Sequence, residues 1–133
     1  MFGSFDISTS ALTAQRERLN TIASNIANVD SVLGPDQKPA PYRRIYPVFQ
    51  AQRQDGGPGV SIARIEQDQT EFIDKFEPWN EVARDARGHV KYPNIDLSTE
   101  YVNALETTRA YEANITAIET TKSMLNATLR VMA

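Results

Sequence analysis

A long segment free of glycine and proline ends the chain, and it constrains the fold more than any other feature. Leu97–Ala133 has apolar residues at alternating spacings of three and four, with Leu105 beside the stripe. This spacing predicts one amphipathic helix with a coiled-coil seam, roughly 50 Å long. The predicted a and d positions are Tyr101, Ala104, Thr108, Tyr111, Ile115, Ile118, Lys122, Leu125, Leu129 and Met132.

A second heptad stripe lies near the N-terminus. Its apolar members recur at spacings of seven, three, four and three, which predicts a second helix. We expect Asp6 or Ser8 to cap its start and the helix to end near Asn28, before Gly34-Pro35. The stripe consists of Leu12, Leu19, Ile22, Ile26 and Val29.

The two stripes are each other's nearest partners, because each needs an apolar surface to cover it. About 23 residues of N-terminal helix cover only about two thirds of the longer helix, so part of its stripe is left for other subunits. We therefore expect a discontinuous coiled-coil domain formed by residues 1–31 and 96–133.

The middle segment, residues 32–95, has the composition of loops and short strands. Pro35, Pro39 and Pro41 predict an exposed loop before a strand within Tyr42–Gln52. The turn at Asp55–Gly59 leads into a second strand with Val60, Ile62 and Ile65, and the alternation slips around Arg64 as at a bulge. These features predict a hairpin.

The remainder of the middle segment is less regular. Phe72, Phe76 and Trp79 fit either a short helical turn or an extended segment. We expect Val90–Ile95 to be only an extended lead into the last helix, which Asp96 or Ser98 caps. The predicted fold is thus mainly α, with a small β-rich insertion between paired terminal helices.

Composition argues against several functional classes. The chain has no cysteine, one histidine and a net charge of −3, and its 14 basic residues form no stripe for nucleic acid. No stretch has the length of a membrane span, and Met1–Ser10 lacks the pattern of a cleaved secretory signal. We expect no cofactor and no metal.

The search for catalytic chemistry also fails. His89 lies in a predicted turn, where a lone histidine is far more often a surface residue than a base. The acidic residues Glu66, Asp68, Glu71 and Asp74 do not have EF-hand spacing, and two glycosylation-type tripeptides lie inside the last helix. We therefore predict a protein that is not an enzyme.

Two terminal stripes and a small insertion suit assembly. Lys122, at an a position, is a residue type that fixes register or partner at a cost in stability. A plain intramolecular core and a soluble coiled-coil adaptor remain alternatives. The predicted assembly seam consists of Leu12, Leu19, Ile22, Ile26, Val29, Tyr101, Leu105, Tyr111, Ile115, Ile118, Leu125, Leu129 and Met132.

Five sequence motifs, in this order, make the chain resemble the bacterial flagellar basal-body rod proteins. They are Leu12–Arg16, Ser24–Val29, Pro41–Arg44, Gly88–Asn94 and Arg109–Asn114. Tyr42–Arg44 and Tyr92–Asn94 favour the C-type proximal-rod subunit, whereas the Asn-rich motif is shared with sister rod subunits. The residues matching the family motif are Asn25, Asn28, Tyr42, Arg43, Arg44, Tyr92, Pro93, Asn94, Tyr111, Glu112 and Asn114.

The resemblance implies a structural subunit that polymerises with copies of itself and with other rod subunits. It implies that the terminal helices form the inner layer of a helical tube and that the middle segment forms a small outer domain. It also implies transit through the flagellar type III export apparatus without cleavage of a signal peptide. The expected location is the flagellar basal body, in a rod that crosses the periplasm, where it is needed for motility.

Overall fold

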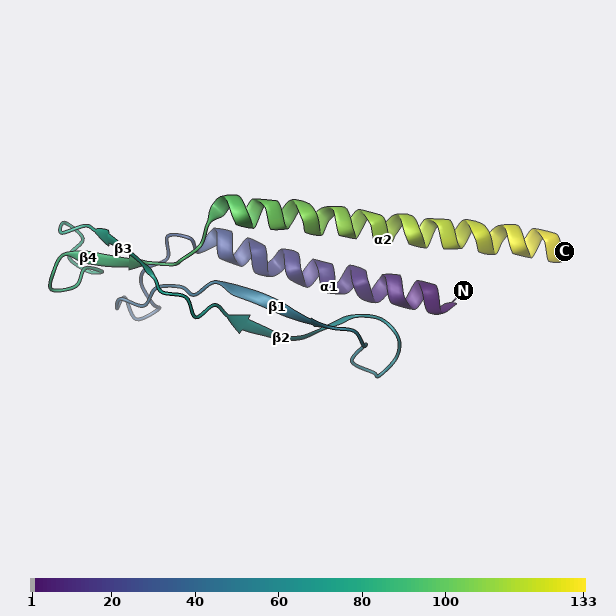
Figure 1. Cartoon of the computed structure of the whole chain (residues 1–133), viewed down its shortest axis with the longest axis horizontal. Helices are drawn as coiled ribbons and strands as arrows, with labels where there is room; N and C mark the ends of the chain where they lie inside the picture. The colour runs from purple at the N-terminus through teal and green to yellow at the C-terminus, as the bar shows by residue number, and fades with distance from the viewer. Residues whose placement is uncertain (1) are drawn as a thin grey trace.

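The fold consists of two long terminal helices and two small β-sheets between them in sequence (Figure 1). The computed structural model describes residues 2–133. The elements are α1 (Phe2–Ala27), β1 (Ile45–Gln50), β2 (Ser61–Gln67), β3 (Ile73–Phe76), β4 (His89–Tyr92) and α2 (Leu97–Met132). Paired terminal helices with a small β region between them were predicted, and this part of the fold is confirmed.

The first helix begins earlier than predicted. Asp6 and Ser8 lie within α1 and cap nothing, because the helix already starts at Phe2. The second helix runs alongside these first turns, and the hydroxyl oxygens of Ser4 and Thr121 lie 3.5 Å apart. A helix end with a partner needs no local cap to persist, since tertiary packing supplies most helix stability. The predicted end near Asn28 agrees with the observed end at Ala27.

The second helix begins at its predicted cap. Asp96 Oδ1 accepts a hydrogen bond from the N–H of Ser98 at 3.0 Å, and Oδ2 accepts one from the Thr99 hydroxyl at 2.9 Å. Both bonds satisfy groups of the first turn that lack helical partners. The helix then continues without a break for 36 residues.

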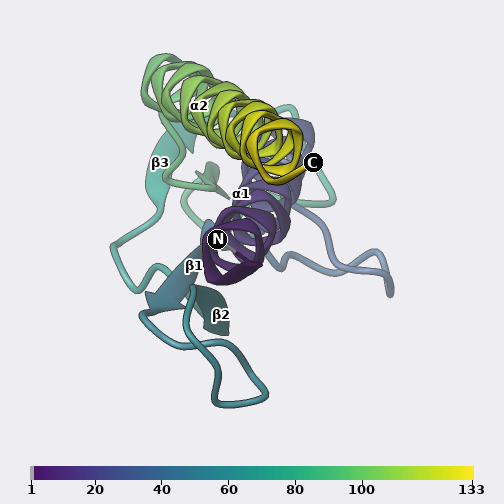
Figure 2. The ribbon, with the colours of Figure 1, turned by 90° about the vertical axis from the view of Figure 1, so that its right-hand side faces the viewer.

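The two helices are antiparallel, and α1 lies between α2 and the β1–β2 hairpin (Figures 1 and 2). Ser4 lies opposite Thr121, Arg18 opposite Glu106, and Asn25 opposite Glu100. The chain therefore forms three thin layers, with the shorter helix in the middle.

β1 and β2 form the predicted hairpin. Val48 pairs with Arg64 and Phe49 pairs with Ile62, so Ala63 is the extra residue of a bulge next to Arg64, as the slipped alternation predicted. Pro47 pairs with Ile65 in a sheet of two strands, where each strand is an edge and can accommodate a proline.

The second sheet corrects the sequence analysis. β3 contains Phe76 in extended conformation, and β4 pairs with it in antiparallel register, so Val90 is a paired strand residue rather than part of a lead. No alternation marks these strands in the sequence, because the sheet is short and Val90 packs inward, fully buried. Gly88 turns the chain into β4 with φ +82°, and a side chain there would meet the ring of Phe76.

The core of a single chain is small. Among the described residues the buried apolar side chains are Ala14, Ile22, Ala83, Val90, Pro93 and Ile95. The buried polar side chains are nearly as many, namely Ser8, Thr21, Asn25, Glu100 and Thr107. Since the layers are thin, polar contacts specify how they fit together, and many apolar side chains remain exposed.

Candidate assembly surface

The side of α2 that faces α1 is more polar than the predicted stripe. The d positions Ala104, Tyr111, Ile118 and Leu125 are half-buried there, as expected, but the companion stripe runs one residue earlier than predicted. These companions are Glu100, Thr107, Asn114 and Thr121, of which Glu100 and Thr107 are fully buried.

The predicted a positions Tyr101, Thr108, Ile115, Lys122 and Leu129 are consequently exposed, Tyr101 at 58% and Leu129 at 56%. Leu105, beside the stripe, is 53% exposed, and the last d position, Met132, is 78% exposed. Among helices and strands of the described chain, only α1 packs on α2. An apolar stripe on α2 is therefore uncovered in the single chain.

The last turns of α2 extend beyond α1, as Figure 1 shows. Ser4, in the first turn of α1, reaches Thr121, and beyond that point Leu125 is still half-buried whereas other apolar side chains are exposed. The exposed side chains of this overhang include Met124, Leu129, Val131 and Met132. The second helix is thus longer than the first, as predicted, and the part of α2 that extends beyond α1 carries exposed apolar side chains.

Four seam residues predicted on the first helix lie on α1, in the middle layer: Ile22 is buried, and Leu12, Leu19 and Ile26 are half-buried. Val29 is half-buried in the turn after α1. None of the four residues on α1 is exposed, unlike Tyr101, Leu105 and Leu129 of α2, because α1 has neighbours on two sides.

Beneath this surface, Asn25 lies at the centre of a buried polar cluster. Its side-chain amide pairs with the backbone of Ile45 in both directions, accepting from the N–H at 2.9 Å and donating to the carbonyl oxygen at 2.8 Å. The Tyr42 hydroxyl donates to the same Asn25 oxygen at 3.2 Å. Asn25 therefore holds the start of β1 against α1 as a strand partner would. Burial, followed by the negative charge of Glu100, raises the pKa of Tyr42.

Glu100 completes this cluster from the second helix. Its side chain is 1% exposed; one carboxylate oxygen accepts a hydrogen bond from Arg44 Nε and the other from Asn25 Nδ2 at 3.4 Å. Each oxygen of the buried carboxylate therefore accepts a hydrogen bond, which a buried charge requires. We call Asn25, Tyr42, Arg44 and Glu100 the polar joint, because they connect α1, α2 and β1.

Arg43 and Arg44 also hold the chain that follows β2. Arg43 donates to the carbonyl oxygens of Asp68 and Thr70 at 3.1 and 3.3 Å, and its guanidinium lies 4.3 Å from the centre of the Phe72 ring. Arg44 lies 3.9 Å from the Asp68 carboxylate. Hydrogen bonds from Thr70 hold the pKa of Asp68 below its usual value, and the two arginines lower it further.

Two further residues of the family motif, Asn28 and Tyr92, form hydrogen bonds with side chains or backbone near them in the fold. The Asn28 amide donates to Ser24 O at 2.8 Å and accepts from Ser31, closing the end of α1. The Tyr92 hydroxyl donates to Glu77 at 3.0 Å, and burial and Glu77 together raise the pKa of Tyr92.

The rest of the motif lies around the start of α2 and along it. Pro93 is buried, and Asn94 donates to Thr70 at 3.2 Å. On α2, Tyr111 and Asn114 are half-buried toward α1, whereas Glu112 is exposed. The structure thus brings Asn25, Tyr42 and Arg44 together in one cluster and leaves the α2 residues apart from it.

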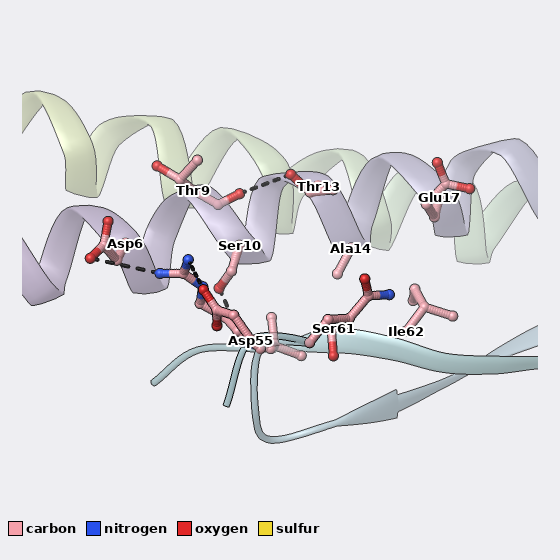
Figure 3. A pocket seen from close by; sticks show the side chains of 12 residues that line it. Asp6, Thr9, Ser10, Thr13, Ala14, Glu17, Asp55, Ser61 and Ile62 are labelled. Atoms are coloured by element: carbon pink, nitrogen blue, oxygen red, sulfur yellow. Dashed lines mark hydrogen bonds and ion pairs between the residues drawn. The ribbon is translucent and has the colours of Figure 1, made fainter. Parts of the chain in front are cut away.

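A cleft with a volume of about 460 Å³ lies between α1 and the tip of the β1–β2 hairpin (Figure 3). Arg53 from the hairpin forms ion pairs with Asp6, at 3.7 Å, and with Asp55. The other polar residues that line the cleft include Thr9, Ser10, Glu17 and Ser61. The ion pair between Arg53 and Asp6 connects the hairpin to the helix across this cleft.

His89 and Asp74, which the sequence offered as possible catalytic or metal-binding residues, contact side chains of the β3–β4 sheet. The ring of His89 lies 5.3 Å from that of Phe76, and Asp74 pairs with Lys91 across β3 and β4. In the described part of the chain, no three acidic, histidine or cysteine side chains gather as a metal site would need. No helix within residues 2–133 has both the length and the apolar character needed to cross a membrane.

Glu100 is the site residue that the sequence analysis missed. The available signal was a charged residue directly before the predicted a position Tyr101, on the side that turned out to face α1. A glutamate in the first turn of a helix is common for electrostatic reasons, so its burial could not be inferred.

Long paired terminal helices, an uncovered apolar stripe and clefts without catalytic groups define a structural protein of the axial-assembly type. Sequence comparison supports this class: the family model described as "Flagella basal body rod protein" matches residues 5–35. The model described as "Flagellar basal body rod FlgEFG protein C-terminal" matches residues 86–131.

Individual relatives match over nearly the whole chain. The flagellar basal-body rod protein FlgC of Escherichia coli O6:H1 is 46% identical over 127 residues, covering 94% of this chain and 92% of its own length. FlgC of Bacillus subtilis is 34% identical, covering 98% and 97%, and FlgC of Aquifex aeolicus is 35% identical, covering 96% and 94%. The chain belongs to the FlgC family of flagellar basal-body rod proteins. It is a structural subunit of the bacterial flagellar rod and not an enzyme, as predicted.

Proposed function

We propose that the chain polymerises with copies of itself and with related rod subunits through the predicted assembly seam of its terminal helices. In this proposal residues 1–31 and 96–133 form one assembly domain, although residue 1 lies outside the described residues. Residues 32–95 form the small outer domain. The terminal helices make the coiled-coil inner layer of the tube.

The uncovered apolar stripe of α2 carries this proposal. A helix of about 54 Å leaves Tyr101, Leu105 and Leu129 exposed, in a stripe that only Thr108 and Lys122 interrupt at its a positions, and a monomer would be expected to cover such side chains. On α2, the residues that face α1 lie next to the residues that are exposed. A second helix can therefore pack on α2 beside α1. The two family models match the two terminal segments, which is consistent with the helices being the shared assembly unit.

The same proposal states how the subunit is exported and where in the cell it is located. The subunit passes through the flagellar type III export apparatus without cleavage of a signal peptide, and the rod it joins crosses the periplasm. Because the rod transmits torque, a strain whose subunits cannot polymerise is non-motile. The names of the relatives, all basal-body rod proteins, support the location in the rod.

A matched pair of aspartate substitutions tests the surface. Leu129→Asp places a charge on the proposed contact stripe, whereas Ala127→Asp places the same charge two residues away on the opposite side of the helix. Both positions are exposed in the single chain, so neither change should unfold it. We expect Leu129→Asp to abolish swimming and to be absent from isolated hook–basal bodies, and Ala127→Asp to be incorporated.

Incorporation of Leu129→Asp at the wild-type level would overturn the proposal. Export should be followed separately, by measuring both variants in the culture medium of a strain that cannot complete its rods. Failure in export and failure in assembly are then distinguished.

A further inference from the structure

We propose that Glu100 determines the register of the two terminal helices, by accepting hydrogen bonds that are available in one alignment only. The inference rests on the proposed assembly function in one respect: register matters because polymerisation needs every subunit to present the same stripe. The observation that carries it, the buried polar joint, is independent of that function.

The apolar contacts between the helices do not define one alignment. Along α2 the half-buried d positions Ala104, Tyr111, Ile118 and Leu125 recur every seven residues, and along α1 Leu12, Leu19 and Ile26 do the same. A shift by one heptad therefore places apolar side chains against apolar side chains again. A sequence repeat of this kind stabilises both alignments to a similar degree.

The companion residues Thr107, Asn114 and Thr121 also recur every seven residues, so they do not define one alignment either. Ser4 faces Thr121 in the observed register, and Thr128 would take that place after a shift of seven residues. The shift moves α1 by about 10.5 Å along α2. The overhang of α2 beyond Thr121 has room for it, because α2 continues to Met132.

The polar joint is the part of the interface that does not repeat. A shift of seven residues puts Thr107 in the place of Glu100, and a threonine hydroxyl cannot accept from both Arg44 and Asn25 in the way the two carboxylate oxygens do. Arg44 is held in place by its backbone oxygen, which accepts from the Asp68 N–H at 2.8 Å, so it cannot follow Glu100 along α2. A single buried polar group is known to fix the register of coiled coils in this manner.

Register can be measured in the full-length chain because it contains no cysteine. One reporter carries Ser4→Cys with Thr121→Cys, and the second carries Ser4→Cys with Thr128→Cys. A short thiol-to-thiol crosslinker joins the first pair in the observed register and the second pair after a shift of one heptad. The ratio of the two yields is compared in three backgrounds: wild type, Glu100→Leu and Glu106→Leu.

Glu106→Leu is the matched control. Glu106 lies on the same helix and faces Arg18 across the same interface at 3.7 Å, but its side chain is 67% exposed. Exposed ion pairs contribute little, so this change should leave the ratio as in wild type. Glu100→Leu should reduce the preference for the 4–121 crosslink by about tenfold or more, as expected for loss of hydrogen bonds to a charged group. Glu100→Leu leaves Arg44 and Asn25 without this acceptor, so helix content is measured in parallel to separate a loss of register from a loss of stability.

The outcomes separate register from simple stability. If Glu100→Leu keeps the wild-type ratio, or if Glu106→Leu lowers it equally, Glu100 does not set the register. If Glu100→Leu loses helix content and both crosslinks, and Glu100→Gln does the same, Glu100 is a stability residue and the proposal is wrong. Glu100→Gln keeps an oxygen acceptor for Arg44 and should restore most of the 4–121 preference.

The crosslink ratio also distinguishes this proposal from the assembly proposal. A changed ratio in Glu100→Leu together with normal incorporation of Leu129→Asp supports the register role and refutes the seam. An unchanged ratio together with loss of Leu129→Asp from rods gives the opposite result.

Discussion

The hydroxyl of Ser10 accepts a hydrogen bond from the N–H of Val60 at 3.1 Å, which joins the tip of the β1–β2 hairpin to α1. Arg53 and Asp6 form an ion pair beside it. These contacts determine where the hairpin lies along the helix, since the sheet itself has only two strands and is marginal alone.

The close approach at this point makes Gly59 difficult to replace. Gly59 has φ +141°, and a Cβ there would overlap the Ser10 hydroxyl and the Arg53 side chain. We expect Gly59→Ala to destabilise the hairpin tip by about 1 kcal/mol or more. Hydrogen exchange should show reduced protection of the Val60 amide, with the α2 amides unchanged. Gly56→Ala is the control, because its φ is also positive, at +83°, but the space around it is open; an equal loss in both variants would attribute the effect to backbone strain alone.

Asp96 should stabilise the start of the second helix. Its carboxylate accepts hydrogen bonds from Ser98 N–H and the Thr99 hydroxyl, so Asp96→Ala should cost about 1 kcal/mol, whereas Asp96→Ser should retain most of this stability. Thermal unfolding followed by circular dichroism measures the difference. Equal stability of the alanine and serine variants would show that the cap is dispensable.

Stability should fall in acid partly through Asp68. Hydrogen bonds from Thr70 lower the pKa of Asp68 in the folded chain. A lowered pKa contributes stability that is present above the unfolded value, about 3.9, and is lost as pH falls through the folded value. Urea unfolding at pH 7 and pH 3 should therefore differ less for Asp68→Asn than for wild type. An Asp68→Asn variant that kept the wild-type pH dependence would contradict the assignment.

Ile118 should be sensitive to charge because it is half-buried between the two helices. Ile118→Asp places a carboxylate against α1 without a partner, and we expect a loss of several kcal/mol and no incorporation into rods. The neighbouring exposed Glu119→Ala should change stability by only a few tenths of a kcal/mol. Circular dichroism and recovery in basal bodies test both. Normal rods from Ile118→Asp with a defect in Glu119→Ala would mean that α2 is oriented differently.

Patterns that extend over many residues were predictable. The seven-residue spacing in both terminal segments and the cap at Asp96 gave the helices, and the slip around Arg64 gave the bulged hairpin. β3 and β4 were not predicted, because four residues with Val90 turned inward carry too little alternation to distinguish a strand from a loop.

Sequence patterns were enough to predict that the ends of this chain are helices, that one is longer, and that the chain belongs with flagellar rod subunits. These properties follow from local spacing and from motifs along the chain. The side of α2 that faces α1 could be read only from the three-dimensional arrangement, which places Glu100, rather than Tyr101, in the contact. This is because the helix can turn by one residue while its d positions keep their contact with α1, whereas the carboxylate of Glu100 can be buried only where Arg44 and Asn25 meet it. Arg44 lies 56 residues away along the chain, and no local pattern connects the two positions.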